Sequence, residues 1–201
     1  MDQKEFNYEK SLFAMIIKWI DKLFYLKSNE KALILQMAYE YKDKVSELYT
    51  LYNNFMKEEG ETCSLEYKDI KIQLAKDEML KMLATLIDFL EEVLPLGSVV
   101  ELNTNFIKEI FGEEQIEKSL KIVITHRFLF KEGEKEYFPY AGVRYPIGTY
   151  DNDKMIHFTS AAIEKILQRG FRDIEEEAYI CVMKNEMLAK NDMYSIGFSR
   201  R

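Results

Sequence analysis

Residues 94–102 read Leu-Pro-Leu-Gly-Ser-Val-Val-Glu-Leu, and this stretch divides the chain into two parts of different character. The residues up to Leu94 include no proline and a single glycine, Gly60, whereas the rest of the chain holds all three prolines and seven of the eight glycines. Glycine and proline interrupt helices and strands most often, so the first part can stay helical and the second must turn often. We therefore predict a helical arm over 1–94, followed by a compact, turn-rich module over 95–201.

The composition is that of a globular protein with its own core. The chain has 201 residues, 47% of them hydrophobic and 31% charged. The net charge of −7 disfavours nucleic acid as a partner, because nucleic acid selects dense positive patches. The apolar run Leu12–Ile17 is too short for a secretory signal or a membrane span, and Lys18 follows it directly. We expect a cytoplasmic protein without membrane insertion.

The residue types that carry chemistry are sparse. The two cysteines, Cys63 and Cys181, allow one disulfide, although free thiols are favoured in a reducing cytosol. His126 and His157 have no third ligand at a spacing typical of metal sites. No combination of acid, base and nucleophile can be named. We therefore expect no metal, no cofactor and no enzymatic activity.

The strongest periodicity lies in the arm between Ile34 and Phe55. Apolar and aromatic residues there follow alternating spacings of four and three, at Ile34, Ala38, Tyr41, Val45, Leu48, Tyr52 and Phe55. This heptad seam predicts one helix of about 28 residues, which begins at Ser28 or Asn29 and ends at Gly60.

Two further helices flank the seam. An apolar stripe over residues 6–26 and a break near residues 27–29 indicate a helical hairpin. Helical spacing returns over 79–93 and ends at Pro95, because the residue before proline disfavours the α region. Residues 69–74 fit either a strand or a helix. The arm is therefore predicted as a helical hairpin or a three-helix unit.

The arm is rich in aromatic residues, which can form a core or a docking face. Tyrosine gives large contact area at low entropic cost, so part of this surface suits a partner. The seam can also pair within the chain or between two copies, which leaves a homo-oligomer through the arm open. The candidate partner-binding residues are Met37, Tyr41, Tyr49 and Tyr52.

The second part is predicted to be a small antiparallel β-sheet with helices after it, so the fold class is α+β. Strands rich in β-branched and aromatic residues are expected over 99–102, 120–130, 137–145 and 156–158. Helices are expected over 105–111, over 161–169 up to Gly170, and from Asp173 onward.

Three motifs in this part resemble a bacterial family, domain of unknown function 4176. They are LPLGSVVEL at 94–102, YAGVRYPIG at 140–148, and the segment IHFTSAAIEKILQRGFRDIEEEAY at 156–179. The resemblance covers a little under half of the chain. The departure is the insert NTNFIKEIFGEEQIEKS at 103–119, where family members turn quickly into the next strand.

The motif residues have a conformational explanation. Glycine permits positive φ and proline fixes its own φ, so these residues are interpreted as setting turns rather than touching a partner. The interpretation covers Pro95, Gly97, Tyr140, Gly142, Tyr145, Pro146, Gly148 and Gly170.

The resemblance also implies a genetic neighbourhood and a role. Family members are typically encoded beside LXG toxins of the type VIIb secretion system in Gram-positive bacteria. The resemblance therefore implies a cytoplasmic adaptor or chaperone that binds an LXG-type toxin, or a secretion component, and assists toxin export. The alternative is an immunity protein that neutralises a cognate toxin, a class to which an acidic charge of −7 is suited.

Overall fold

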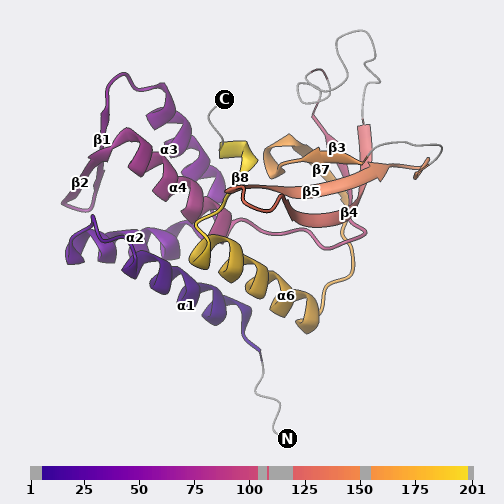
Figure 1. Cartoon of the computed structure of the whole chain (residues 1–201), viewed down its shortest axis with the longest axis horizontal. Coiled ribbons are helices and arrows are strands. Elements are labelled where there is room, and N and C mark those ends of the chain that lie inside the picture. Colours follow the sequence, from indigo (N-terminus) through magenta and orange to yellow (C-terminus); the bar gives the residue numbers. More distant parts are fainter. Residues whose placement is uncertain (1–5, 104–107, 109–119, 150–154, 199–201) are drawn as a thin grey trace, which may run out of the picture. The chain divides into compact units, whose positions relative to one another are not determined.

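The computed structural model describes residues 6–103, 108, 120–149 and 155–198, and its fold is α+β as predicted (Figure 1). The chain forms two compact units. The first comprises Met1–Glu92 and Ile180–Tyr194, and the second comprises Val93–Tyr179 and Ser195–Arg201. Apart from Lys108, which is helical, the helix expected over 105–111 lies outside the described residues.

The first unit is built mainly from helices (indigo to magenta in Figure 1). They are α1 (Tyr8–Asp21), α2 (Ser28–Tyr41), α3 (Val45–Lys57) and α4 (Lys76–Leu90). Every residue from Met82 to Leu90 in α4 is buried. A helix that is buried on all sides lies at the centre of a unit, and α1, α2 and α3 all contact α4.

The single long helix predicted from the heptad seam is wrong. The chain turns between α2 and α3, where the Lys44 N–H donates to the Tyr41 carbonyl oxygen at 2.9 Å. Ile34 and Leu48 are both fully buried, one on each side of this turn. A straight helix of about 28 residues would extend about 42 Å, whereas α4 is about 22 Å long. The break lets both halves of the seam pack against the same short helix.

A β-hairpin lies between α3 and α4. Strand β1 (Thr62–Tyr67) pairs antiparallel with β2 (Ile70–Ala75). This settles the ambiguity over 69–74 in favour of a strand. The two-residue turn, Lys68 and Asp69, has positive φ at both positions, which is typical of tight hairpins.

Residues 180–194 belong to the first unit, whereas the sequence placed them in the second module. Helix α6 (Ile174–Lys184) runs directly into a π-helix over Asn185–Lys190. The fully buried Lys184 amine donates to the carbonyl oxygens of Phe89 at 2.7 Å and Glu91 at 2.8 Å. It thereby satisfies carbonyls at the C-terminal end of α4, where a positive charge is favourable.

The second unit is a six-stranded antiparallel sheet (orange and pink in Figure 1). The strand order is β6-β5-β4-β3-β7, and β8 pairs with β5. The strands are β3 (Val99–Leu102), β4 (Leu120–Phe130), β5 (Glu136–Arg144), β6 (Ile156–Phe158), β7 (Ile163–Gln168) and β8 (Tyr194–Ser195). The buried core on this sheet consists of Leu94, Val100, Leu102, Leu120, Ile122, Ile124, Tyr140, Ile156, Phe158 and Ala162.

The helix predicted over 161–169 is wrong, because β7 occupies this region after a short 3-10 turn over Ser160–Ala162. Leu102 is paired with Ile163, and Val100 with Ile166. Because of two bulges, Ile163 and Ile166 are three residues apart on β7, although their partners Leu102 and Val100 are two residues apart on β3. A spacing of three mimics helical periodicity, which explains the error.

Within the described ranges, no helix combines the length and the apolar composition needed to cross a membrane.

Candidate functional site

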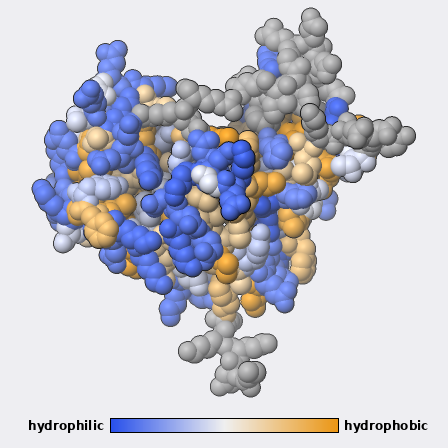
Figure 2. All heavy atoms as spheres, viewed as in Figure 1, coloured by the Kyte–Doolittle hydropathy of each residue, from blue (hydrophilic) through white to orange (hydrophobic). Residues whose placement is uncertain are grey.

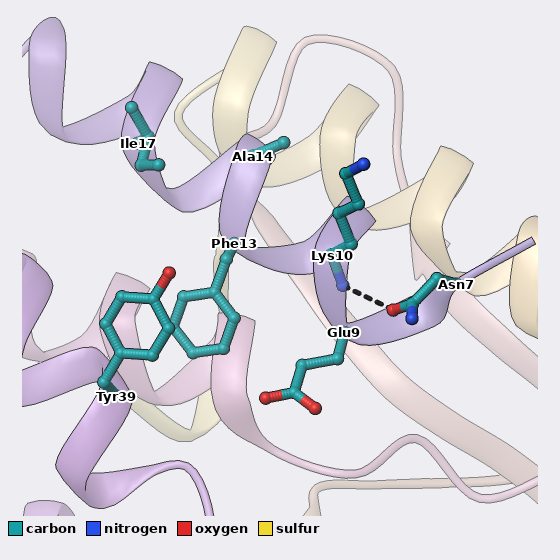
Figure 3. Close-up of a pocket in the computed structure, with 7 residues that line it drawn as sticks. All are labelled: Asn7, Glu9, Lys10, Phe13, Ala14, Ile17 and Tyr39. Atoms are coloured by element: carbon teal, nitrogen blue, oxygen red, sulfur yellow. Dashed lines mark hydrogen bonds between the residues drawn. The ribbon is translucent and has the colours of Figure 1, made fainter.

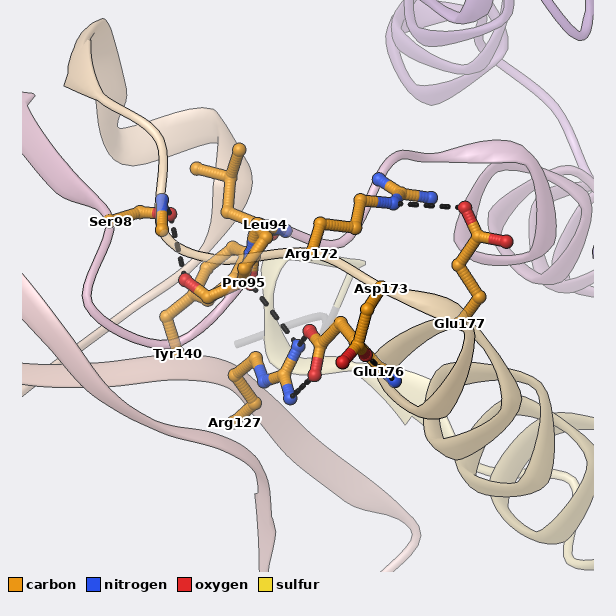
Figure 4. A network of polar contacts seen from close by, with 10 residues as sticks. Leu94, Pro95, Ser98, Arg127, Tyr140, Arg172, Asp173, Glu176 and Glu177 are labelled. Carbon is orange, nitrogen blue, oxygen red and sulfur yellow. Dashed lines mark hydrogen bonds and ion pairs between the residues drawn. The ribbon is translucent and has the colours of Figure 1, made fainter.

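The three sequence motifs converge on the loop that precedes β3 (Figure 4). The buried Ser98 hydroxyl donates to the Pro95 carbonyl oxygen at 2.7 Å and accepts the Gly170 N–H at 2.9 Å. The Tyr140 hydroxyl accepts the Leu94 N–H at 3.0 Å. Residues from the first, second and third motif therefore share one buried hydrogen-bond network. Since buried polar groups are costly unless they are paired, this network fixes the loop conformation.

The motif glycines serve two different purposes. Gly97 and Gly148 have φ of +78° and +72° and lie at turns, where a side chain would be strained. Gly142 and Gly170 have no positive φ, so the turn interpretation is wrong for them. A Cβ on Gly142 would lie 2.2 Å from the Val123 carbonyl oxygen. These two positions need glycine because another backbone segment passes too close for any side chain.

The remaining motif residues lie in or next to β5. Tyr140 is buried within the strand rather than in a turn, and its role is the hydrogen bond to Leu94. Tyr145 and Pro146 form a turn after the strand, joined by a cis peptide bond. The turn is closed by the Gly148 N–H, which donates to the Arg144 carbonyl oxygen at 2.7 Å.

A buried ion pair adjoins this network. The Arg127 guanidinium on β4 binds the Glu176 carboxylate of α6 with both terminal nitrogens, and the Nη2–Oε2 distance is 3.0 Å. Arg127 also lies over the Tyr179 ring, with 5.3 Å from its Cζ to the centroid. In the described part of the chain its Nε has no hydrogen-bond partner. The pair fixes the first half of α6 within the second unit.

An unusual backbone conformation explains how Arg127 reaches α6. Phe128 has φ of +55°, and the consecutive residues Arg127 and Phe128 are both buried, which breaks the alternation of a regular strand. The Phe128 ring packs edge-on to Tyr179 at 6.4 Å between centroids. Left-handed backbone at a bulky residue is costly and persists only where its surroundings hold it. Here it turns two neighbouring side chains toward the same helix.

The first unit contains an open groove on α1 and α2 of about 470 Å³ (Figure 3). The Phe13 and Tyr39 rings are stacked there almost in parallel, with 3.9 Å between centroids and 3° between planes. Phe13 is buried, whereas Tyr39 is 49% exposed and Ile17 is 41% exposed. Asn7, Glu9, Lys10 and Ala14 complete the lining. The groove therefore offers a rigid aromatic face beside polar and charged groups.

Charged groups surround one end of this groove. Glu9 accepts a hydrogen bond from Lys42, and this bond raises the pKa of the lysine. The Asn7 side chain accepts the Lys10 N–H at 2.8 Å and thereby caps the start of α1. The polar end is thus built from the first turn of α1, while the apolar part follows along the same helix.

The structure separates the four predicted partner-binding residues. Met37 and Tyr52 are buried in the core of the first unit and present no surface to a partner. Tyr41 is partly exposed and packs against Tyr67 with 6.4 Å between ring centroids. Tyr49 is partly exposed, and its hydroxyl donates to Glu91 at 2.9 Å. None of the four lines the groove on α1 and α2.

The sequence analysis did not select Tyr39 as a partner-binding residue. Tyr39 lies one residue beyond Ala38 of the seam, and this offset turns its ring away from the α4 side of the helix. A large aromatic residue just outside an apolar seam was the available indication.

Other reactive groups are dispersed. His126 contacts Thr125 at 2.9 Å, and His157 packs against Phe138 with 5.2 Å between ring centroids. Cys63 and Cys181 are both buried thiols, not a disulfide. Among the described residues, no cluster of three or more histidine, cysteine or acidic side chains is placed to hold a metal ion. Burial raises the pKa of Tyr25 to about 12, with smaller effects from Glu78 and Asp192.

Exposed apolar residues are scattered over a mainly hydrophilic surface, as the face in Figure 2 shows. They are numerous in the second unit: Leu96, Phe130, Tyr145, Ile147, Ile166, Leu167, Phe171, Ile174 and Tyr179.

These features define the class of the second unit: a small α+β module in which the buried motif residues Ser98, Tyr140 and Gly142 hold its backbone together. Residues 93–179 match the family model for the domain of unknown function DUF4176 and belong to that family. No curated protein and no solved structure matches the chain. The first unit, apart from residues 180–194, lies before the matched region.

Proposed function

We propose that this protein is a cytoplasmic, non-enzymatic adaptor or chaperone that binds an LXG-type toxin and assists its type VII secretion. The resemblance of residues 94–179 motivates the choice of partner, since relatives of this domain are typically encoded beside such toxins. The observation that carries the binding role is the groove with the stacked Phe13 and Tyr39 rings.

The groove suits an apolar helical segment. Phe13, Ile17 and Tyr39 give an apolar floor, and Glu9 and Lys10 provide charges at one end. Amphipathic helices bind such grooves by inserting apolar side chains spaced three and four residues apart. Tyr39 is held flat by Phe13, so little side-chain entropy is lost when a partner covers it. Rigid, half-exposed aromatic residues of this kind are typical centres of binding energy.

Export of the toxin tests the proposal. Deletion of the gene should abolish secretion of the toxin encoded beside it, and the wild-type chain should restore it. The double variant Ile17→Glu and Tyr39→Ala should fail to restore export and should no longer retain the toxin in a pulldown. Phe24→Ala removes a more exposed aromatic residue of the same unit, outside the groove, and serves as the matched control.

Two outcomes would contradict the proposal. Full toxin in the medium after deletion would exclude a role in export. Growth rescue by this chain in cells that express the isolated toxin domain would instead establish the immunity role, for which the net charge of −7 is the supporting observation.

A further inference from the structure

The β-hairpin of the first unit has a sheet edge along β1 (Figure 1). Strands β1 and β2 pair with each other in a regular register, from Thr62↔Ala75 to Tyr67↔Ile70. Helix α2 packs against β2, and α4 packs against both strands. Among the strands that the structure describes, none pairs with the other side of β1. The backbone groups on that side are therefore available to a further strand.

The hairpin geometry identifies the backbone groups that point outward from β1. The two-residue turn makes Tyr67 and Ile70 a hydrogen-bonded pair, and such pairs alternate with non-bonded pairs in an antiparallel ladder. The N–H and C=O groups of Thr62, Ser64 and Glu66 therefore point away from β2. In the described part of the chain, no backbone hydrogen bond outside the hairpin involves these three residues. Their side chains are exposed as well.

This edge lacks the features that protect the edges of the six-stranded sheet. Proteins prevent edge pairing with short strands, lysines and bulges. In the six-stranded sheet, the edge strand β6 has three residues, and the edge strand β7 carries two bulges and Lys165. Strand β1 has six residues, a regular register, no proline and no lysine. An edge of this kind is complementary to another extended strand.

The sequence of β1 is complementary to a second copy of itself. In a two-fold antiparallel pair, an axis through Ser64 places this residue opposite Ser64 of the second copy and Thr62 opposite Glu66. All three outward-pointing residues then form hydrogen-bonded pairs, whereas an axis through either neighbouring residue engages only two of them. The two glutamates are about 14 Å apart along the strands, at ~3.4 Å per residue, so their repulsion is largely screened.

We propose that two copies of this chain associate through their β1 strands, which pair antiparallel about a two-fold axis at Ser64. The two hairpins then form one four-stranded sheet in the order β2-β1-β1-β2, and the symmetry closes the assembly at two copies. On the buried face, Cys63 lies opposite Leu65 of the second copy, which extends the apolar face that both residues share with β2. Each copy carries −7, so added salt should raise the dimer fraction.

Two proline variants at facing positions test the edge. Ser64→Pro removes an outward-pointing N–H of β1 and leaves the hydrogen bonds of the hairpin in place, so it should raise the dimer Kd at least about tenfold. Gln73 faces Ser64 on β2, and Gln73→Pro removes an outward-pointing N–H from the other edge. This matched control should remain a dimer like the wild type. Light scattering after gel filtration distinguishes a dimer from the 23.9 kDa monomer.

A cysteine cross-link tests the position of the axis without removing any backbone group. Facing residues of an antiparallel pair lie at a Cα distance that a disulfide spans, and only a residue on the axis faces its own copy. Ser64→Cys should therefore form an intermolecular disulfide at least about tenfold faster than Glu66→Cys, which faces Thr62. The natural cysteines, Cys63 and Cys181, are both buried.

Three results would overturn the proposal. A wild type that is monomeric at every concentration would overturn it in favour of a strand from a different protein. Equal dimer Kd values of the two proline variants would show that the edge of β1 is not the interface. Equal cross-linking rates of the two cysteine variants would exclude the axis at Ser64.

This inference stands apart from the proposed function. The groove variant with Ile17→Glu and Tyr39→Ala should dimerise as the wild type does, so loss of toxin export and loss of the dimer report on different surfaces.

Discussion

The two units of this protein achieve order by different means. In the second unit, backbone segments approach so closely that only glycine fits, and a buried serine and tyrosine hydrogen-bond the loop before β3. In the first unit, helices pack around the buried α4, and the buried Lys184 binds carbonyl groups at the end of that helix. The matched family region, residues 93–179, lies within the second unit and ends directly before Ile180, where the chain rejoins the first unit.

This difference teaches where sequence motifs arise. A glycine under a crossing backbone or a serine with two buried hydrogen bonds admits few replacements, so its neighbourhood becomes a recognisable pattern. A helical core accepts many apolar side chains of suitable volume, so its sequence varies while the fold persists. The first unit is therefore free to carry a surface specific to one partner.

The largest expected effect tests the close backbone approach in the second unit. Gly170→Ala would place its Cβ 2.0 Å from the Leu96 carbonyl oxygen and should reduce the free energy of unfolding by about 3 kcal/mol or more. Gly97→Ala places its Cβ in open space, so it should reduce the free energy of unfolding only by the cost of positive φ, about 1 kcal/mol. Urea denaturation measures both. Equal losses would show that the approach at Gly170 is not the constraint.

The second effect tests the lysine that closes α4 in the first unit. Lys184→Met keeps an unbranched side chain but leaves the carbonyl groups of Phe89 and Glu91 without their charged donor. The free energy of unfolding should fall by about 2 kcal/mol. Lys190→Met removes an exposed lysine whose partner is Glu186 and should cost less than about 0.5 kcal/mol. If the two variants unfold at the same urea concentration, Lys184 does not have this role.

The smallest effect concerns pH in the first unit. Burial raises the pKa of Tyr25 to about 12, above its ordinary value of 10.0, so the folded state retains the proton that the unfolded state releases. This stability is complete below pH 10 and is lost as the pH rises toward 12. Since the side chain is partly exposed, about 1 kcal/mol is expected after solvent screening.

Urea denaturation of the wild type and Tyr25→Phe at pH 9 and at pH 11 checks this dependence. The wild type should lose more stability over this interval than the variant. An ultraviolet titration in which all tyrosines ionise near pH 10 would contradict the shift.

The sequence was sufficient for the fold class and for strands whose alternation is regular. The apolar alternation of β4 up to Ile124 and the short β6 were predicted at nearly their observed bounds. The bulges of β7 give it a helix-like spacing of apolar residues, so this strand was predicted as a helix. The heptad spacing continues across the turn near Lys44, so the turn was not predicted. Both errors arise because periodicity records which residues are buried but not how the backbone brings them there.

Surface features were predicted less well for a related reason. Met37 and Tyr52 are residue types typical of a docking face, yet they pack inside the unit. Tyr39 follows Met37 by two residues on α2, and its different angular position around the helix leaves it half-exposed. The pairing of Arg127 with Glu176 depends on the left-handed backbone at Phe128, and no local sequence pattern predicts that backbone conformation. Residues far apart in sequence meet in each case, so the tertiary fold determines the outcome.

The division of the first unit between residues 1–92 and 180–194 has a consequence for biosynthesis. Translation proceeds from the N-terminus, and domains generally fold as units as they emerge. The amine of Lys184 reaches α4 only after strands β3 to β7 have all left the ribosome. The first unit begins to be synthesised first, but it is completed only after the main sheet of the second unit. A nascent chain that stalls before residue 184 therefore exposes an incomplete helical core, to which a chaperone would bind.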